Sequence, residues 1–243
     1  GYEPWVSDGT STGTHLLIDT VAGDSAPFRI SYGESSSGAV VASYVQATEQ
    51  ADFWLTDGTT PGTTKYYTGY LYSDFTSSNG NIYFSGYDAT NGQQLWKTDG
   101  TLPNTSLVKA LKVGSVFDYS INWIHPFNNS VVFAPNRGIP GNPWISDGTA
   151  AGTVELIHLV NGNWDTSYPS GAIQLGAGQM IFAAYDASFH QALYSTDGTP
   201  AGTALLKDVN PGAGPGIYLF TEASNRAIFT ADDGIKGYEL WST

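Results

Sequence analysis

The chain has 243 residues, a length that fits one closed all-β domain. Its 41 % hydrophobic and 14 % aromatic content excludes a disordered chain, although only 13 % of the residues are charged. The 29 glycines and 12 prolines indicate many tight turns and argue against long helices.

The net charge of −13 excludes nucleic acid as a partner, because that binding needs clustered basic residues. No apolar run is long enough to predict membrane insertion. The absence of cysteine excludes disulfides, thiolate zinc sites and a cysteine nucleophile. The sequence begins at Gly1 rather than Met, so we expect a mature or excised piece of a longer precursor.

One motif, W-x-x-D-G-T-x-x-G-T, recurs along the chain. The repeats begin near residues 1, 50, 92, 140 and 190. In chain order, their copies are PWVSDGTSTGT (4–14), FWLTDGTTPGT (53–63), LWKTDGTLPNT (95–105), PWISDGTAAGT (143–153) and LYSTDGTPAGT (193–203). The motif Asp stands at positions 8, 57, 99, 147 and 197, so the spacing is 49, 42, 48 and 50 residues. This spacing is typical of propeller blades.

Each repeat predicts four short strands arranged as two hairpins. The aromatic segment and the segment after D-G-T form one hairpin. A Gly- and Pro-rich crossing follows, and then a second hairpin turns at Asn/Gly. Its outgoing strand occurs five times, at 40–47, 82–89, 131–138, 180–187 and 227–234. We therefore predict a single all-β domain over 1–243, a five-bladed β-propeller of four-stranded antiparallel blades.

The two ends of the sequence are near copies, GYEPW (1–5) and GYELW (237–241). Residues 237–243 thus duplicate the first strand, and six aromatic strands must serve five blades. The surplus strand can be disordered, pack at the seam or pair with a neighbouring molecule.

The motif resembles the ELWxxDGT repeat of bacterial secreted and surface proteins over essentially the whole chain. The resemblance implies an extracellular or cell-surface β-propeller-like module, often one part of a larger protein, and implies no known chemistry. Departures are Pro4 and Pro143 in place of Leu, Tyr194 in place of Trp and Asn104 in place of Gly.

The repeated motif residues are interpreted as structural. One Trp per blade is most simply explained by packing between neighbouring blades. The motif Asp is a habitual turn residue, and one carboxylate per turn falls short of the six to eight oxygens of a calcium site. The scattered histidines form no zinc motif.

A second set of acids lies in four successive crossings, and in a propeller these positions would form a ring at one mouth of the axis. Its members are Asp24, Asp74, Asp118 and Asp165. They are the candidate metal ligands, with calcium as the candidate ion, and no other cofactor is expected. The alternative is that each is a solvated turn residue.

Aromatic residues in or beside the same crossings vary between blades, as expected of a binding surface on a repeated scaffold. Tyr or Trp beside Asp suits neutral sugars. The predicted ligand-binding residues are Tyr72, Asp74, Tyr119, Trp123, Trp164 and Tyr168. The alternative is that these aromatics cover the blade interfaces.

We predict a non-enzymatic extracellular module that recognises a glycan or surface polymer. The second hypothesis is an architectural subunit, in which the duplicated terminal strand pairs with copies of the chain or with sister domains. The third is a glycan hydrolase using acids near the axis, among them Glu34, Glu222, Asp74 and Asp118. No pair of these acids carries a recognisable catalytic signature.

Overall fold

The computed structural model describes residues 3–20, 30–45, 48–111, 120–136, 141–159, 169–186, 188, 190–210 and 216–243. The chain divides into two compact units, residues 1–114 and 115–243. Within the described residues the only helix is the short 3₁₀ turn η1 (Leu102–Asn104). None of the described segments forms a helix with the length and apolar character that crossing a bilayer requires.

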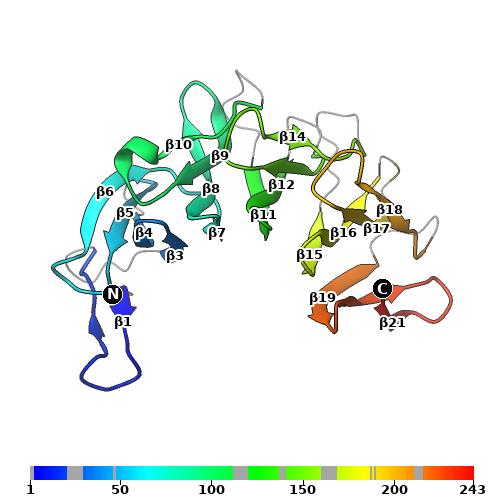
Figure 1. The fold of residues 1–243 in the computed structure, drawn as a ribbon, viewed down its shortest axis with the longest axis horizontal. Helices are drawn as coiled ribbons and strands as arrows, with labels where there is room; N and C mark the ends of the chain where they lie inside the picture. The colour runs from blue at the N-terminus through cyan, green and yellow to red at the C-terminus, as the bar shows by residue number, and fades with distance from the viewer. Residues whose placement is uncertain are drawn as a thin grey trace. The chain divides into compact units, whose positions relative to one another are not determined.

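Unit 1 contains two four-stranded antiparallel sheets and one two-stranded sheet. The two-stranded sheet joins β1 (Trp5–Val6) and β2 (His15–Leu16). The next sheet comprises β3 (Ile30–Ser35), β4 (Gly38–Val45), β5 (Gln50–Thr56) and β6 (Thr64–Gly69). The third comprises β7 (Thr76–Ser78), β8 (Asn81–Asp88), β9 (Gly92–Thr98) and β10 (Ser106–Leu107), and Figure 1 shows it beside β3–β6.

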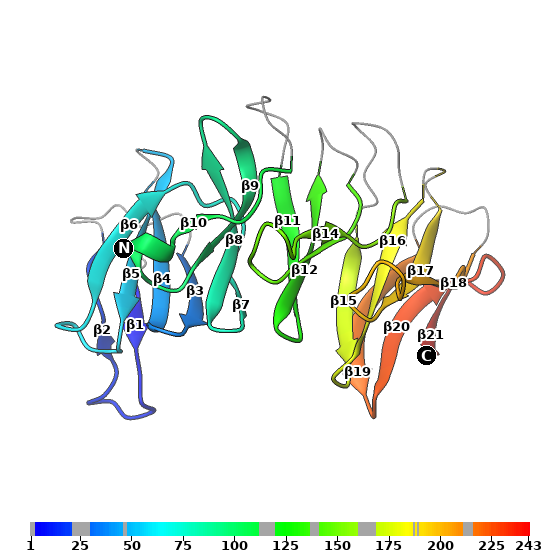
Figure 2. The ribbon, with the colours of Figure 1, turned by 45° about the horizontal axis from the view of Figure 1, so that its top comes forward.

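Unit 2 contains two four-stranded antiparallel sheets and one three-stranded sheet. The first comprises β11 (Ser120–Phe127), β12 (Ser130–Asn136), β13 (Trp144–Ser146) and β14 (Val154–Glu155). The second comprises β15 (Ser170–Leu175), β16 (Gln179–Tyr185), β17 (Gln191–Thr196) and β18 (Ala204–Lys207). The third comprises β19 (Ile217–Ala223), β20 (Arg226–Asp232) and β21 (Tyr238–Ser242), and Figure 2 shows β19 near β15.

The predicted all-β chain of four-stranded antiparallel sheets is confirmed. The motif strands are β1, β5, β9, β13, β17 and β21, so the predicted six copies are all present. The described residues form four complete sheets, and the remaining strands form the two-stranded and the three-stranded sheet. The two-stranded sheet holds the third and fourth strands of a repeat. The three-stranded sheet holds the first three.

Tight turns join the first two strands of a sheet. Between β7 and β8 the chain reverses at Asn79 and Gly80, with φ of 47° and 73°. Both values lie in the left-handed region, which glycine and asparagine tolerate best. Asn128 between β11 and β12 has φ of 50°, so the same turn chemistry recurs.

The core lies between sheets rather than inside any one of them. In unit 1, Val40 and Phe53 of the β3–β6 sheet cluster with Ile82 and Phe84 of the β7–β10 sheet. All four side chains are fully buried, and Trp96 packs against them. The motif Trp therefore contributes to packing here, as predicted.

Unit 2 repeats this arrangement. Met180 of β16 packs against Phe127, Val132 and Ile145 of the preceding sheet. A second cluster joins the β15–β18 sheet to the β19–β21 sheet, and Trp241 packs against it. A single four-stranded sheet has two faces and cannot bury either one alone, so neighbouring sheets stabilise each other.

The D-G-T segment is a closed hydrogen-bond network. In the second copy, an Asp57 carboxylate oxygen accepts bonds from the Thr59 backbone N–H at 2.9 Å and from its hydroxyl at 2.7 Å. The Thr59 hydroxyl oxygen accepts the Gly62 N–H at 3.0 Å, and Thr63 donates its hydroxyl to the Thr59 carbonyl at 2.7 Å. Gly58 adopts φ of 90°. The motif Asp, Gly and Thr residues therefore each contribute a hydrogen bond or a required backbone conformation to the turn.

The third copy explains how the turn tolerates Asn104 in place of glycine. A Cβ built on Gly62 would lie 2.0 Å from the Asp57 carboxylate. In the third copy the chain instead forms η1, and the Asn104 side chain donates to the Asp99 carboxylate at 2.7 Å. The amide side chain thus replaces a clash with a hydrogen bond.

Gly62→Ala should destabilise unit 1 by about 1–3 kcal/mol, because the added methyl group displaces the Asp57 carboxylate. Gly62→Asn is the matched control, since Thr-Leu-Pro-Asn-Thr (101–105) already accommodates Asn after Pro. Gly62→Asn should lower the free energy of unfolding by clearly less than Gly62→Ala does. Urea unfolding of the two variants measures the difference, and equal destabilisation would contradict this explanation.

Acid should weaken these turns. Hydrogen bonds from the Thr two residues later in the chain hold the pKa of Asp8, Asp57 and Asp197 below the ordinary aspartate value of 3.8. A lowered carboxyl pKa stabilises the fold above the unfolded pKa, and this contribution is lost as pH falls through the folded pKa. The urea midpoint should therefore fall steeply below about pH 4. Asp57→Asn should flatten that fall, and an unchanged slope would contradict the assignment.

Candidate binding site

Half of the predicted ligand-binding residues can be placed. Tyr72, Asp74 and Trp123 are described, whereas Tyr119, Trp164 and Tyr168 lie outside the described residues. Of the predicted metal ligands, Asp24, Asp118 and Asp165 also lie outside them. The ring of carboxylates therefore stays a prediction.

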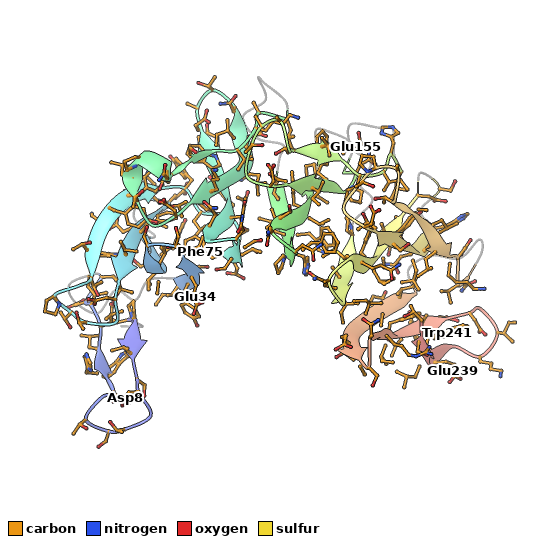
Figure 3. All side chains as sticks on the ribbon, in the orientation of Figure 1. Asp8, Glu34, Phe75, Glu155, Glu239 and Trp241 are labelled. Carbon is orange, nitrogen blue, oxygen red and sulfur yellow. The ribbon has the colours of Figure 1, made fainter. Side chains whose placement is uncertain are left out.

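Asp74 connects two sheets of unit 1. Its carboxylate accepts the Ser31 hydroxyl of β3 at 3.0 Å, and nearby the Glu34 N–H donates to the Ser77 hydroxyl at 2.9 Å. These bonds join β3 to the segment at β7, and Figure 3 labels Glu34 on β3. Among the described residues, no three His, Asp or Glu side chains gather as a metal site would require.

Trp123 contributes to packing in unit 2. It lies on β11, half-buried, with its ring 6.1 Å from that of Phe182 and 4.8 Å from that of His125. It also packs against the clusters around Met180 and Tyr194. The geometry at this position matches the alternative that the large aromatics cover the interfaces between sheets.

Tyr72 belongs to an aromatic cluster on unit 1. The segment before β7 is hydrogen-bonded to β8, since the Tyr72 N–H donates to the Ser85 carbonyl at 2.9 Å. The Tyr72 ring stacks on Tyr70 with centroids 6.0 Å apart and planes at 9°, and Tyr70 meets Tyr87 edge to face at 5.0 Å. Tyr72 keeps 40 % of its surface exposed. We call Tyr70, Tyr72 and Tyr87 the first tyrosine cluster.

A second tyrosine cluster, formed by Tyr185, Tyr218 and Tyr238, lies on unit 2. The Tyr218 and Tyr238 rings lie 5.8 Å apart at 45°, and Tyr218 is 43 % exposed. Burial, followed by the neighbouring Tyr218 and Tyr238, raises the pKa of Tyr185. Tyr185 interacts with both of the other two tyrosines.

The two clusters share one equivalent position, held by Tyr87 and Tyr185. The other tyrosines of the first cluster precede β7 of the same sheet, whereas those of the second cluster lie on β19 and β21 of the next sheet. Tyr87 on β8 is opposite Gln93, and Tyr185 on β16 is opposite Gln191. Both tyrosines stand at the fourth position of the sequence pattern F-x-x-Y-D-A, at 84–89 and 182–187. The sequence prediction missed Tyr70, Tyr87, Tyr185 and Tyr238, although this pattern marked two of them.

The paired glutamines differ in their contacts. The Gln191 side-chain oxygen accepts the buried N–H groups of Gly216 and Ile217 at 3.0 and 2.9 Å. The corresponding Gln93 oxygen is buried without a hydrogen-bond partner among the described residues. Gln93 lies beside the Tyr72 hydroxyl. Gln191 is therefore structural, while Gln93 adds a polar group next to an exposed ring.

The Tyr72 hydroxyl remains protonated at neutral pH. Burial, then Tyr70, Tyr87 and Glu49, raise the pKa of Tyr72 above the ordinary tyrosine value of 10.0. A neutral phenol both donates and accepts hydrogen bonds, and its ring offers an apolar face. Each cluster can therefore contact a polar ligand that has an apolar side.

The candidate catalytic acids have structural contacts of their own. Glu222 accepts the Asn225 N–H at 2.6 Å in the turn between β19 and β20. Asp74 accepts the Ser31 hydroxyl, and Asp118 lies outside the described residues. The described geometry does not assign a catalytic pair.

The sequence matches no protein-family model and none of the curated proteins. Solved structures with a similar fold include a puromycin hydrolase, with a TM-score of 0.56 at 14 % identity. That match covers 94 % of this chain and 38 % of the hydrolase chain. A prolyl endopeptidase matches with a TM-score of 0.51 at 11 % identity, over 93 % of this chain and 36 % of its own.

A third similar structure is the β-propeller domain of the trilobed protease from Pyrococcus furiosus, described as having an open velcro topology. Its TM-score is 0.50 at 12 % identity, over 87 % of this chain and 67 % of that domain. Together with the four-stranded antiparallel sheets, this likeness assigns the chain to the β-propeller type of fold. The chain spans well under half of the puromycin hydrolase and prolyl endopeptidase chains.

Gln191→Leu should destabilise unit 2 by about 2–4 kcal/mol, because it leaves the Gly216 and Ile217 N–H groups buried without an acceptor. Gln93→Leu is the matched control in unit 1 and should change stability by less than about 1 kcal/mol. Chemical unfolding of the two variants tests this asymmetry. Equal losses would show that the two glutamines have the same role.

Proposed function

We propose that this chain is an extracellular, non-enzymatic binding module that recognises neutral glycans through its two tyrosine clusters. The observation that carries the proposal is a group of three neighbouring tyrosines on each unit, with exposed rings in both groups: Tyr72 at 40 % in the first, and Tyr218 at 43 % and Tyr238 at 57 % in the second. The resemblance to the ELWxxDGT repeat supports an extracellular location.

The chemistry of the first tyrosine cluster suits a sugar. The C–H face of a pyranose packs on an aromatic ring, while its hydroxyls bond to phenol, amide and carboxylate groups. The exposed Tyr72 ring has Gln93 and Glu49 beside it. With a net charge of −13, the chain favours a neutral ligand over an anionic one.

Two clusters on one chain favour a polymeric ligand. A single exposed ring gives weak binding, but two linked sites raise the apparent affinity through effective concentration. This fits a surface polysaccharide better than a single small sugar. Calcium is not required by this proposal, because it relies on stacking and hydrogen bonds.

The enzyme alternative has less support in the described residues. The similar peptidases share under 15 % identity with this chain, and likeness at that level concerns the fold alone. Each candidate acid that can be placed either has a structural hydrogen-bond partner or lacks a second carboxylate with which it would form a catalytic pair. A binding module needs only the exposed clusters.

An array of neutral glycans with terminal glucose, galactose, mannose or N-acetylglucosamine tests this function. The wild-type chain should bind at least one class. Tyr72→Ala and Tyr218→Ala should each weaken binding about 5- to 30-fold, which corresponds to the loss of one stacking contact. Tyr72→Phe keeps the aromatic ring, so it should weaken glycan binding by less than Tyr72→Ala does.

Tyr32→Ala is the matched control, because Tyr32 is a 74 % exposed tyrosine of unit 1 outside both clusters. It should leave glycan binding unchanged. Absence of binding by the wild-type chain would contradict the function. Equal binding by wild type and both cluster variants would refute the clusters as the site.

A further inference from the structure

Two Asn-Gly pairs of unit 1 lie in hairpin turns that differ in their contacts. The chain has three such pairs, which begin at Asn79, Asn91 and Asn161, and the last of them lies outside the described residues. Asn79 lies in the turn between β7 and β8, and Asn91 in the turn between β8 and β9. An asparagine before glycine is prone to lose its side-chain amide, because glycine has no side chain to hinder attack by its own backbone nitrogen.

The Asn91 amide is held by the Asp88 carboxylate. Its nitrogen donates to the two carboxylate oxygens at 3.0 and 2.9 Å, and the Asn91 backbone N–H donates to the same group at 2.8 Å. Gly92, whose nitrogen would have to attack, is buried. The strands β8 and β9 pair at seven positions. Attack on this amide therefore requires breaking charge-assisted hydrogen bonds and opening a long hairpin.

The Asn79 amide is not held in this way. Asn79 and Gly80 are both exposed, and in the described part of the chain the Asn79 side chain makes no hydrogen bond. Its backbone carbonyl accepts the Asn81 side-chain N–H at 3.2 Å. The strands β7 and β8 pair at three positions. The exposed end of so short a hairpin opens locally at low cost.

We propose that Asn79 is a modification site at which the chain deamidates without an enzyme to aspartate and isoaspartate, while Asp88 protects Asn91. The Gly80 backbone nitrogen attacks the Asn79 Cγ, the bond from Cγ to the side-chain nitrogen breaks, and ammonia leaves with the proton of the Gly80 N–H. Water then opens the cyclic imide at either carbonyl. The net change consumes one water and releases one ammonia, with no oxidation or reduction.

The conformation of the turn sets when this reaction occurs. Asn79 and Gly80 have φ of 47° and 73°, which closes the tight turn between β7 and β8. Ring closure requires rotation about the Asn79 backbone, so the reaction proceeds from the locally opened turn. The rates at Asn79 and Asn91 therefore depend on how easily each hairpin opens and each amide is released.

Modification at this turn acts on the junction between two sheets of unit 1. The Gly80 carbonyl accepts the Ser36 N–H of the β3–β4 turn at 2.7 Å. A Cβ built on Gly80 would lie 3.1 Å from the Ser36 Cβ, so the two turns approach closely. Isoaspartate adds one backbone atom before Gly80 and replaces a neutral amide with a carboxylate. It should displace the Gly80 carbonyl from Ser36 and weaken the junction as the protein ages.

Incubation of the purified chain in mildly alkaline buffer tests the site. Peptide mapping by mass spectrometry measures conversion at each asparagine, and chromatography separates aspartate from isoaspartate. Conversion at Asn79 should be at least about tenfold faster than at Asn91, because charge-assisted hydrogen bonds hold the Asn91 amide. In concentrated urea both turns unfold, so the two rates should agree within about twofold.

Asp88→Ala tests the protection of Asn91. It releases the Asn91 amide, so conversion there should rise about fivefold or more, while conversion at Asn79 should stay unchanged. Circular dichroism verifies that the variant is folded.

Two variants at position 79 test the effect on the junction. Asn79→Gly removes the reactive amide and tolerates the left-handed turn, so it should keep its urea midpoint on ageing better than the wild type does. Fresh Asn79→Asp carries the charge without the added backbone atom, so it should be more stable than the isoaspartate form isolated from aged wild type.

The proposal is overturned if the folded chain converts Asn91 as fast as Asn79, or leaves Asn79 intact while the urea-unfolded chain is converted. A rate difference that persists in urea would mean that sequence, and not the fold, selects the site. An equal loss of urea midpoint in aged wild type and aged Asn79→Gly would refute the effect on the junction. None of these measurements involves a glycan.

Discussion

The structure depends on burial between sheets. Each four-stranded sheet has two faces, and one such sheet is too small to cover either of them. Phe53 and Phe84 meet across two sheets of unit 1, as Phe127 and Met180 do in unit 2. The repeated aromatic and aliphatic positions follow from this constraint.

The D-G-T turn is stabilised by local hydrogen bonds rather than by burial between sheets. Its hydrogen bonds lie within seven residues or fewer, from the Asp57 carboxylate to the Thr56–Thr63 hydroxyl pair. The turn therefore forms the same way in each copy, whatever the neighbouring crossing contains. This local independence leaves the crossings free to vary, and the tyrosine clusters use that freedom.

The tyrosine clusters give the scaffold surfaces on which rings lie beside polar groups, which suits a sugar. One cluster lies on each unit, so a single chain offers two places for a polymeric ligand to bind, and linked contacts raise the apparent affinity.

Much of the site escaped sequence analysis for a physical reason. Tyr72 and Asp74 were predicted from their place in a crossing. The stacking of Tyr72 on Tyr70 and the contact of Tyr70 with Tyr87 arise because the segment before β7 lies against β8. Trp123 illustrates the reverse. Its sequence neighbourhood suggested a ligand platform, while the structure places its ring 6.1 Å from that of Phe182 on another sheet. Exposure depends on what lies opposite, and one repeat in isolation does not reveal this.

The all-β class, the four-strand repeat, the turns and the six aromatic strands can be predicted from short stretches of the chain. These features depend on residues close together: Asp57 with Thr59, Asn79 with Gly80, and alternating apolar residues within one strand. The folded chain is needed to see which sheets are complete, which faces are buried and which tyrosines are in contact. Those outcomes depend on pairings across tens of residues, such as Ser31 with Asp74 and Gln191 with Gly216, and no local pattern encodes them.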